Sequence, residues 1–151
     1  MASVEEYAEA LADGIEAALA TWVVGCITAV MDRAGRPMTP EIGLAAEVAG
    51  ELARREAGAA VRDLLRADVD EQATTPLAIL RWAVRYPTEV LYQTGVPPLE
   101  RDRFVQAAFP DDIYGLSPSS FADIDPALAE LGIVWGAAKA FEHRRRHRSA
   151  E

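Results

Sequence analysis

Residues 17–31 read AALATWVVGCITAVM, and this uncharged run decides the fold. As a helix it would extend about 22 Å, which is short of the ~30 Å hydrocarbon core of a bilayer. Glu16 and Asp32 close the run at its two ends. The run therefore predicts a helix that is buried inside a protein and does not span a membrane.

The same helix extends outward in both directions. Ser3 is a typical N-cap residue ahead of an acidic first turn, and Gly35 before Pro37 is typical of a helix end. We therefore expect one helix over residues 3–34. Its larger apolar residues recur in steps of three and four, which marks one face: Val4, Tyr7, Leu11, Ile15, Leu19, Trp22, Cys26 and Val30.

Small residues form a second stripe on this helix, at Ala10, Gly14, Ala17, Thr21, Gly25 and Thr28. Such a stripe allows another backbone to approach closely. Beyond Glu16 the helix is apolar nearly all round, so other helices or a second subunit should cover it. Trp22, Gly25 and Ile27 are the candidate residues for packing or self-association.

A second long helix begins at Thr39-Pro40, with Thr as N-cap and Pro at the first helical position. Gly50 and Gly58 weaken it, and a kink or break near Gly58 is expected. Its charged face should be solvated and carries Glu47, Glu51, Arg54, Arg55, Arg62 and Arg66. Residues 67–74 are polar and predict a loop.

Seven of the nine prolines fall between Pro76 and Pro126, so shorter elements follow. We expect a helix over residues 75–84 that Pro87 halts or bends, and a short turn of helix over 88–93. Another helix should start at Pro98 and bury Phe104, Val105, Ala108 and Phe109. Residues 110–126 predict an ordered loop, and the last helix should cover about 128–147.

No alternating strand pattern competes with these helices. The predicted fold is all-α, with five to six helices, and the long N-terminal helix is a central strut with shorter proline-initiated helices packed around it. Residues 1–151 form one domain, in which residues 1–68 are a long-helix scaffold and residues 75–148 are the proline-punctuated part.

The chain carries 24 acidic and 15 basic residues, a formal net charge of −9. An acidic surface of this kind repels nucleic acid and anionic lipid. Cys26 is the single cysteine, so no intramolecular disulfide is possible, and no basic-apolar signal peptide is visible at the N-terminus. A cytoplasmic location is expected, and the use of Arg in place of Lys indicates a GC-rich bacterial genome.

Candidate chemistry is sparse. His143 and His147 share a helix face, but three arginines lie between them and oppose a cation, so no metal or other cofactor is expected. Asp111, Asp112 and Asp123 in the acidic loop do not have the spacing of a calcium loop and are better explained as local caps. No catalytic triad or nucleophile elbow is present.

Two features of the last helix remain. Gly132, Gly136 and Ala140 recur every four residues, which favours close packing on the small-residue stripe of the first helix, or self-association. Lys139 and the arginines Arg144, Arg145, Arg146 and Arg148 make the C-terminal end basic, against a single Glu142. This end is either a solvated terminus or a contact for an acidic partner, and Arg81, Trp82 and Arg85 would extend it if they lay nearby.

The sequence therefore favours a small non-enzymatic interaction or regulatory protein. It would self-associate through the first helix and present the acidic loop, with Asp111, Asp112 and Tyr114, and the arginine end to a protein partner. One alternative is an enzyme or small-ligand binder with a groove near Asp111, Asp112 and Asp123, together with Tyr114 and Trp135. The other is a nucleic-acid-associated protein that uses the C-terminal arginines.

Overall fold

The computed structural model describes residues 3–66 and 75–150, and these residues form helices without a β-strand. The predicted loop at 67–74 lies outside the described residues. The elements are α1 (Val4–Arg33), α2 (Pro40–Arg66), α3 (Thr75–Trp82), α4 (Arg85–Gln93), α5 (Arg103–Ala108), the short 3₁₀ helix η1 (Phe121–Asp123) and α6 (Leu128–Ala150). The all-α prediction with a long N-terminal helix is confirmed.

Both ends of α1 are set by local sequence, as predicted. The Ser3 hydroxyl accepts a hydrogen bond from the backbone N–H of Glu6 at 3.2 Å, which satisfies one free donor of the first turn. At the other end Gly35 adopts a φ of +67°, and the N–H of Arg36 donates to the carbonyl of Met31 at 2.9 Å. This left-handed glycine turn releases the chain into α2.

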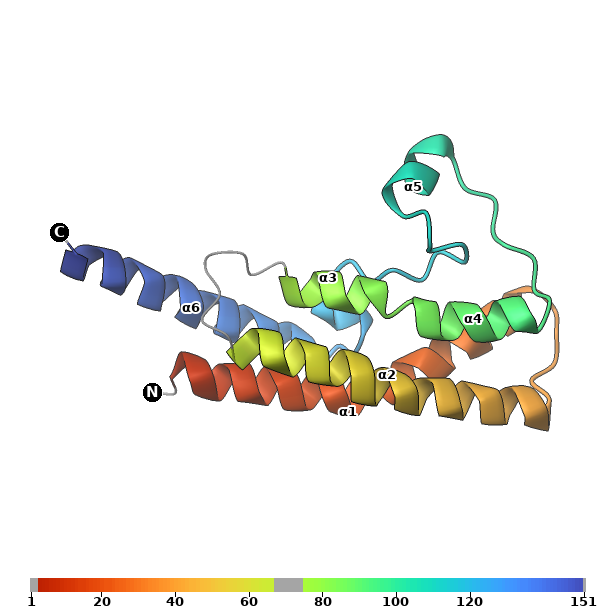
Figure 1. Cartoon of the computed structure of the whole chain (residues 1–151), viewed down its shortest axis with the longest axis horizontal. Coiled ribbons are helices and arrows are strands. Elements are labelled where there is room, and N and C mark those ends of the chain that lie inside the picture. Colours follow the sequence, from red (N-terminus) through yellow and green to blue (C-terminus); the bar gives the residue numbers. More distant parts are fainter. Residues whose placement is uncertain (1–2, 67–74, 151) are drawn as a thin grey trace.

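Helices α1 and α2 lie side by side and antiparallel (Figure 1). The two backbones approach closely at Gly50, where an added Cβ would lie 2.8 Å from the carbonyl oxygen of Ala20. Gly58 faces α1 as well, against the side chain of Glu16. The predicted break near Gly58 is wrong, because α2 continues through both glycines and uses their lack of a side chain to contact α1.

Helix α6 packs on the N-terminal half of α1 at Gly14, where Leu128 and Leu131 occupy the space that a Cβ would need. The glycines of α6 do not make this contact. Gly132 lies under the ring of Phe121, and Gly136 has nothing within 4 Å of an added Cβ. The predicted close packing of these glycines on the first helix is therefore wrong, because leucines make the contact.

The greater part of the small-residue stripe of α1 faces outward. Ala10, Ala17, Thr21, Gly25 and Thr28 are exposed, and an added Cβ at Gly25 would meet nothing within 4 Å.

Helices α3 and α4 lie against the α1–α2 pair through Leu80, Ala83, Val84 and Leu91, which are buried. Pro87 does not halt a helix as predicted. It occupies the first turn of α4, which begins at Arg85, because proline lacks only an N–H that has no helical acceptor there. Helix α4 ends at Gln93, and the turn that follows it contains Gly95, whose φ is +84°.

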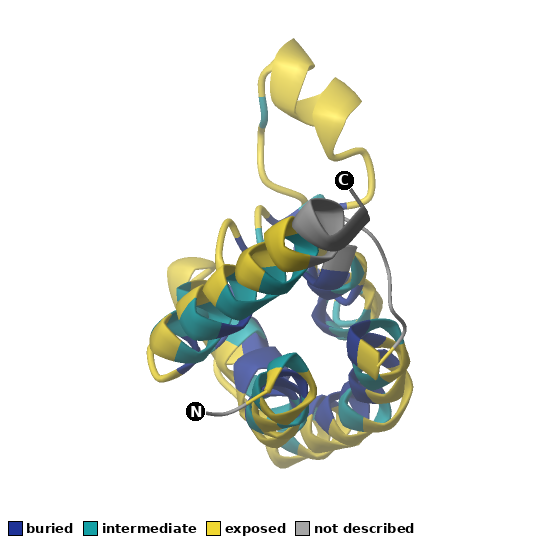
Figure 2. Ribbon diagram, turned by 90° about the vertical axis from the view of Figure 1, so that its left-hand side faces the viewer, coloured by how far each residue is buried: buried dark blue, intermediate teal, exposed yellow. Residues whose placement is uncertain are grey.

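The apolar side of α1 is covered by its own chain. Trp22 and Ile27 are buried, together with Leu11, Ile15, Leu19, Val23 and Met31. Figure 2 shows the buried residues gathered where α1, α2, α4 and α6 face one another. Among the described helices, α1 is also long and apolar enough by composition to cross a bilayer, and 44% of that window is buried in the fold.

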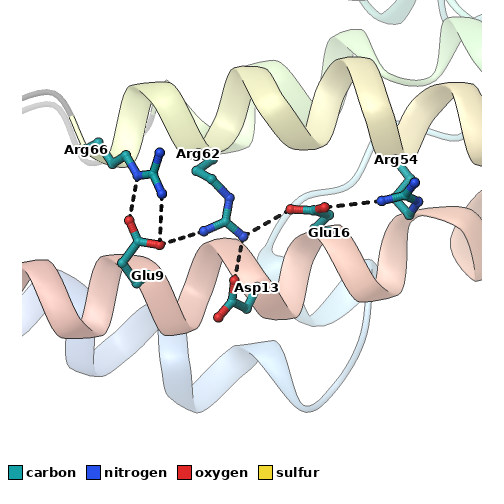
Figure 3. Close-up of polar contacts among 6 residues, drawn as sticks. All are labelled: Glu9, Asp13, Glu16, Arg54, Arg62 and Arg66. Carbon is teal, nitrogen blue, oxygen red and sulfur yellow. Dashed lines mark hydrogen bonds and ion pairs between the residues drawn. The ribbon is translucent and has the colours of Figure 1, made fainter.

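Six charged side chains form a ladder of ion pairs along the α1–α2 pair (Figure 3): Glu9, Asp13 and Glu16 from α1, and Arg54, Arg62 and Arg66 from α2. Arg62 bonds all three carboxylates, at 2.6 Å from Glu9 and 3.0 Å from Glu16. Only 18% of its side chain is exposed, so the prediction of a solvated face is wrong at this residue. A hydrogen bond from Arg66 holds the pKa of the Glu9 carboxyl below its ordinary value.

Residues 97–110, here called the arm, project from the bundle and contain α5 (Figures 1 and 2). Helix α5 begins after Asp102, whose carboxylate accepts the N–H of Val105 at 2.9 Å, and not at Pro98. None of its residues is buried, and Phe104 is 87% exposed. The predicted burial of Phe104, Val105, Ala108 and Phe109 is wrong, because the arm leaves the bundle before α5 begins.

Candidate binding groove

An open groove of about 570 Å³ lies between α3–α4 and the base of the arm. Residues from two distant parts of the sequence line it: Arg81, Trp82, Val84, Arg85, Thr88, Glu89 and Tyr92 from one side, and residues 108–113 with Ser117 from the other. This volume falls within the range of sites that hold small molecules or side chains of a partner.

The α3–α4 wall is aromatic and basic. The guanidinium of Arg85 lies 4.6 Å from the centre of the Trp82 ring, a cation–π contact. The Trp82 ring also meets Tyr86 edge-on, with centroids 5.9 Å apart. Trp82 is nevertheless half-exposed, and Tyr92 is more exposed still. The wall therefore offers flat apolar surface beside a positive charge.

Two hydrogen bonds hold this wall in place. Arg81 donates to the backbone carbonyl of Pro118 at 3.3 Å, which ties α3 to the loop across the groove. The hydroxyl of Tyr86 donates to Glu56 on α2 at 2.8 Å. Partial burial and this hydrogen bond raise the pKa of Tyr86 to about 12. Tyr86 is therefore a neutral donor that fixes the wall and does not ionise near neutral pH.

The opposite wall is anchored by Asp112. Its carboxylate is buried and accepts the backbone N–H groups of Leu116 at 2.6 Å and Ser117 at 2.8 Å. The neighbouring Tyr114 is buried as well, and its hydroxyl donates to the carbonyl of Val96 at 2.7 Å. Asp112 and Tyr114 therefore shape the loop from inside, and their side chains are not available to a partner on the surface.

The residues that the sequence grouped around the acidic loop are only partly brought together. Asp111 is exposed and lines the groove beside Asp112. Asp123 does not line it, because its carboxylate accepts the N–H groups of Ser119 and Ser120 and caps η1. Trp135 is buried on α6, where Lys139 lies 5.3 Å from its ring centre.

One lining residue carries an unsatisfied polar atom, which lies below the surface of the groove. Thr88 is a lining residue, and its hydroxyl oxygen is buried without a hydrogen-bond partner in the described part of the chain. The exposed charged groups of the lining are Arg81, Arg85, Glu89 and Asp111. Neither His nor Cys lines the groove, and within residues 3–66 and 75–150 no three metal-binding side chains gather. The chemistry available is contact with an apolar side chain, flanked by charges of both signs.

The arginine end of α6 is not part of this groove. Arg144 and Arg145 are exposed, and Arg145 pairs with Glu142 at 3.0 Å. The side chains of Arg146 and Arg148 lie outside the described residues, as does that of His147. Arg81, Trp82 and Arg85 line the groove, whereas Arg144 and Arg145 do not.

The sequence indicated a groove near Asp111 and Asp112, which line the observed one, but it did not identify Tyr92 or the α3–α4 wall. A signal was present in the spacing of Trp82 and Arg85, which puts an aromatic ring and a guanidinium on neighbouring turns. No family model matches the sequence, and no curated protein or solved structure matches it either. The ligand of the groove is therefore inferred from its own residues.

Proposed function

We propose that this chain is a non-enzymatic interaction protein that binds other protein through the groove and the arm. The observation that carries the proposal is an uncovered apolar surface on a projecting element, directly beside an aromatic groove. Phe104 and Val105 lie on the arm, and Phe109 lies where the arm meets the groove. Contiguous exposed apolar surface of this kind marks protein contact sites.

The structure of the arm supports a binding role, because packing against the bundle does not stabilise its helix. Helix α5 has six residues and buries none of them. An isolated helix of this length is marginal in water, so its stability should rise when a partner covers Phe104 and Val105. Exposed aromatic and arginine residues are also the types that dominate binding energy at protein interfaces.

Charge favours protein over nucleic acid as the partner. The exposed charges of the groove are Arg81 and Arg85 against Glu89 and Asp111, and the whole chain carries −9. A phosphate backbone requires a surface with excess positive charge, which this groove does not offer. A protein surface with mixed charges and an apolar centre fits it better.

A small-molecule ligand in the same groove is the second candidate. The observation that favours it is the volume of the groove, about 570 Å³, together with its aromatic and charged lining. An Asp111→Ala substitution would weaken such a ligand, because a charged group exposed in the groove would be lost. The same change would leave a protein contact centred on Phe104 intact.

Photo-crosslinking tests the proposed function. A photoreactive phenylalanine analogue is placed at Phe104, and in a matched variant at Phe141 on α6, which is 60% exposed. Irradiation of each protein in native lysate should give a discrete adduct from position 104 and none from position 141. The proposal is wrong if neither position, or only position 141, gives an adduct.

A further inference from the structure

We infer that the groove is filled by the arm of a second copy of this chain, in a reciprocal exchange that places Phe104 of each copy between Trp82 and Tyr92 of the other. This inference rests on the proposed function and names the partner. The groove is then incomplete in a single chain. A two-fold arrangement follows from the reciprocity of the exchange, because each chain gives its arm to the copy whose arm it receives.

Geometry supports the exchange. The arm projects away from its own bundle, so α5 does not occupy the groove beside its base (Figure 1). Phe104 is 87% exposed, while Trp82 and Tyr92 offer uncovered ring surface in the groove. Aromatic rings brought together in this way gain offset or edge-on contacts in addition to the area they bury.

Charge complementarity selects a second copy as the occupant. The arm carries Glu100 and Arg103, which are exposed, and α4 presents Arg85 and Glu89 one turn apart. If the arm runs alongside α4 in the same direction, Glu100 meets Arg85 and Arg103 meets Glu89. Of the four charges at positions 100–103, Glu100 and Arg103 are thereby each matched by a charge of opposite sign on α4.

The exchange also limits repulsion between two acidic chains. Residues 100–103 read Glu-Arg-Asp-Arg and sum to zero, and the exposed charges of the groove comprise two of each sign. The contact is therefore locally neutral in a chain of net charge −9. At physiological salt the remaining charges are screened beyond about 8 Å.

This contact is separate from the self-association predicted through the first helix, where Gly25 is exposed. Trp22 and Ile27 are buried within one chain and would be reached only by unfolding. The arm is reached without any rearrangement of the bundle.

Sedimentation velocity of the full-length protein over a concentration series tests the exchange. The wild type should form a dimer, and Phe104→Asp should weaken it about thirtyfold or more, as expected for a central aromatic contact. Phe141→Asp places the same charge on another exposed site and should leave the dimer unchanged. Circular dichroism should show equal folding for both variants, because neither side chain is buried.

Charge reversal gives a second, independent readout. Arg85→Glu and Glu100→Arg should each weaken the dimer, and the double variant should recover most of the loss because the pair is restored with its signs exchanged. A dimer that is insensitive to Phe104→Asp, or a double variant weaker than both single variants, contradicts the exchange.

A wild type that stays monomeric throughout also overturns it. In that case an adduct from position 104 with a different protein in lysate leaves the proposed function standing. The absence of any adduct removes both.

Discussion

Replacement of Gly50 by Ala should destabilise the protein, although alanine is the better helix former. In a helix interior this substitution alone would gain about 1 kcal/mol. At Gly50, however, the new Cβ would lie 2.8 Å from the carbonyl oxygen of Ala20 and 3.1 Å from its Cα. Both atoms belong to the backbone of α1, so no side chain can move aside and the two helices must separate.

The magnitude follows from a matched variant. Gly25→Ala lies inside α1, where an added Cβ meets nothing within 4 Å, so it reports the helix-propensity gain without a steric cost. The difference between the two variants therefore isolates the cost of overpacking, about 1–3 kcal/mol. Gly25→Ala should be more stable than wild type, and Gly50→Ala should fall below Gly25→Ala by that amount.

Urea unfolding followed by far-ultraviolet circular dichroism measures both variants. A difference of this size corresponds to a midpoint shift on the order of 1 M, and in thermal unfolding to roughly 2–4 °C per kcal/mol. If the two variants are equally stable within about 0.5 kcal/mol, the close contact of α1 and α2 at Gly50 is wrong.

Three further predictions concern charge and the thiol. Arg62→Ala removes the contacts with Glu9 and Glu16 and should lower the free energy of unfolding by about 1 kcal/mol. Arg55→Ala, on the exposed face of α2, should change that free energy little. Unfolding in urea measures both variants. Because Arg66 holds the pKa of Glu9 below its ordinary value of 4.5, the contribution of this pair should be complete above pH 4.5 and disappear as the pH falls through the lowered pKa. The difference in unfolding free energy between wild type and Arg66→Ala should therefore be smaller at pH 3 than at pH 7. Burial raises the pKa of Cys26 from 9.0 to about 12, so its thiolate fraction at pH 8 falls roughly a thousandfold. Alkylation of Cys26 by iodoacetamide should be correspondingly slower than that of a free thiol. A rate equal to that of free cysteine would contradict this burial.

Helix ends and the core face of α1 were readable from the sequence. Ser3 and Gly35 act through bonds to residues within a few positions, so local pattern identified both. Trp22 and Ile27 lie in the core because the run around them is too apolar for any other place in the fold. Such features depend on neighbours in the chain, which the sequence displays directly.

The ladder of ion pairs and the projecting arm depend on tertiary structure and could not be predicted from the sequence. Arg62 and Glu9 lie 53 residues apart and meet only once the approach at Gly50 sets the register of α2 on α1. Phe104 has the apolar spacing of a buried residue, and no local signal distinguishes burial in the bundle from exposure on a projecting arm. The sequence indicated only the Asp111–Asp112 side of the groove, because the α3–α4 wall comes from a separate segment of the chain.

The way in which the arm is attached allows its sequence and length to change. The N–H of Leu99 donates to the carbonyl of Ile113 at 2.9 Å, and the Tyr114 hydroxyl reaches the carbonyl of Val96, so the chain enters and leaves the arm at neighbouring points. Because loop length alters closure entropy only slowly, residues between these points can lengthen, shorten or be grafted without disturbing the helices beneath. A lineage could therefore redesign what this protein recognises while its scaffold stays the same.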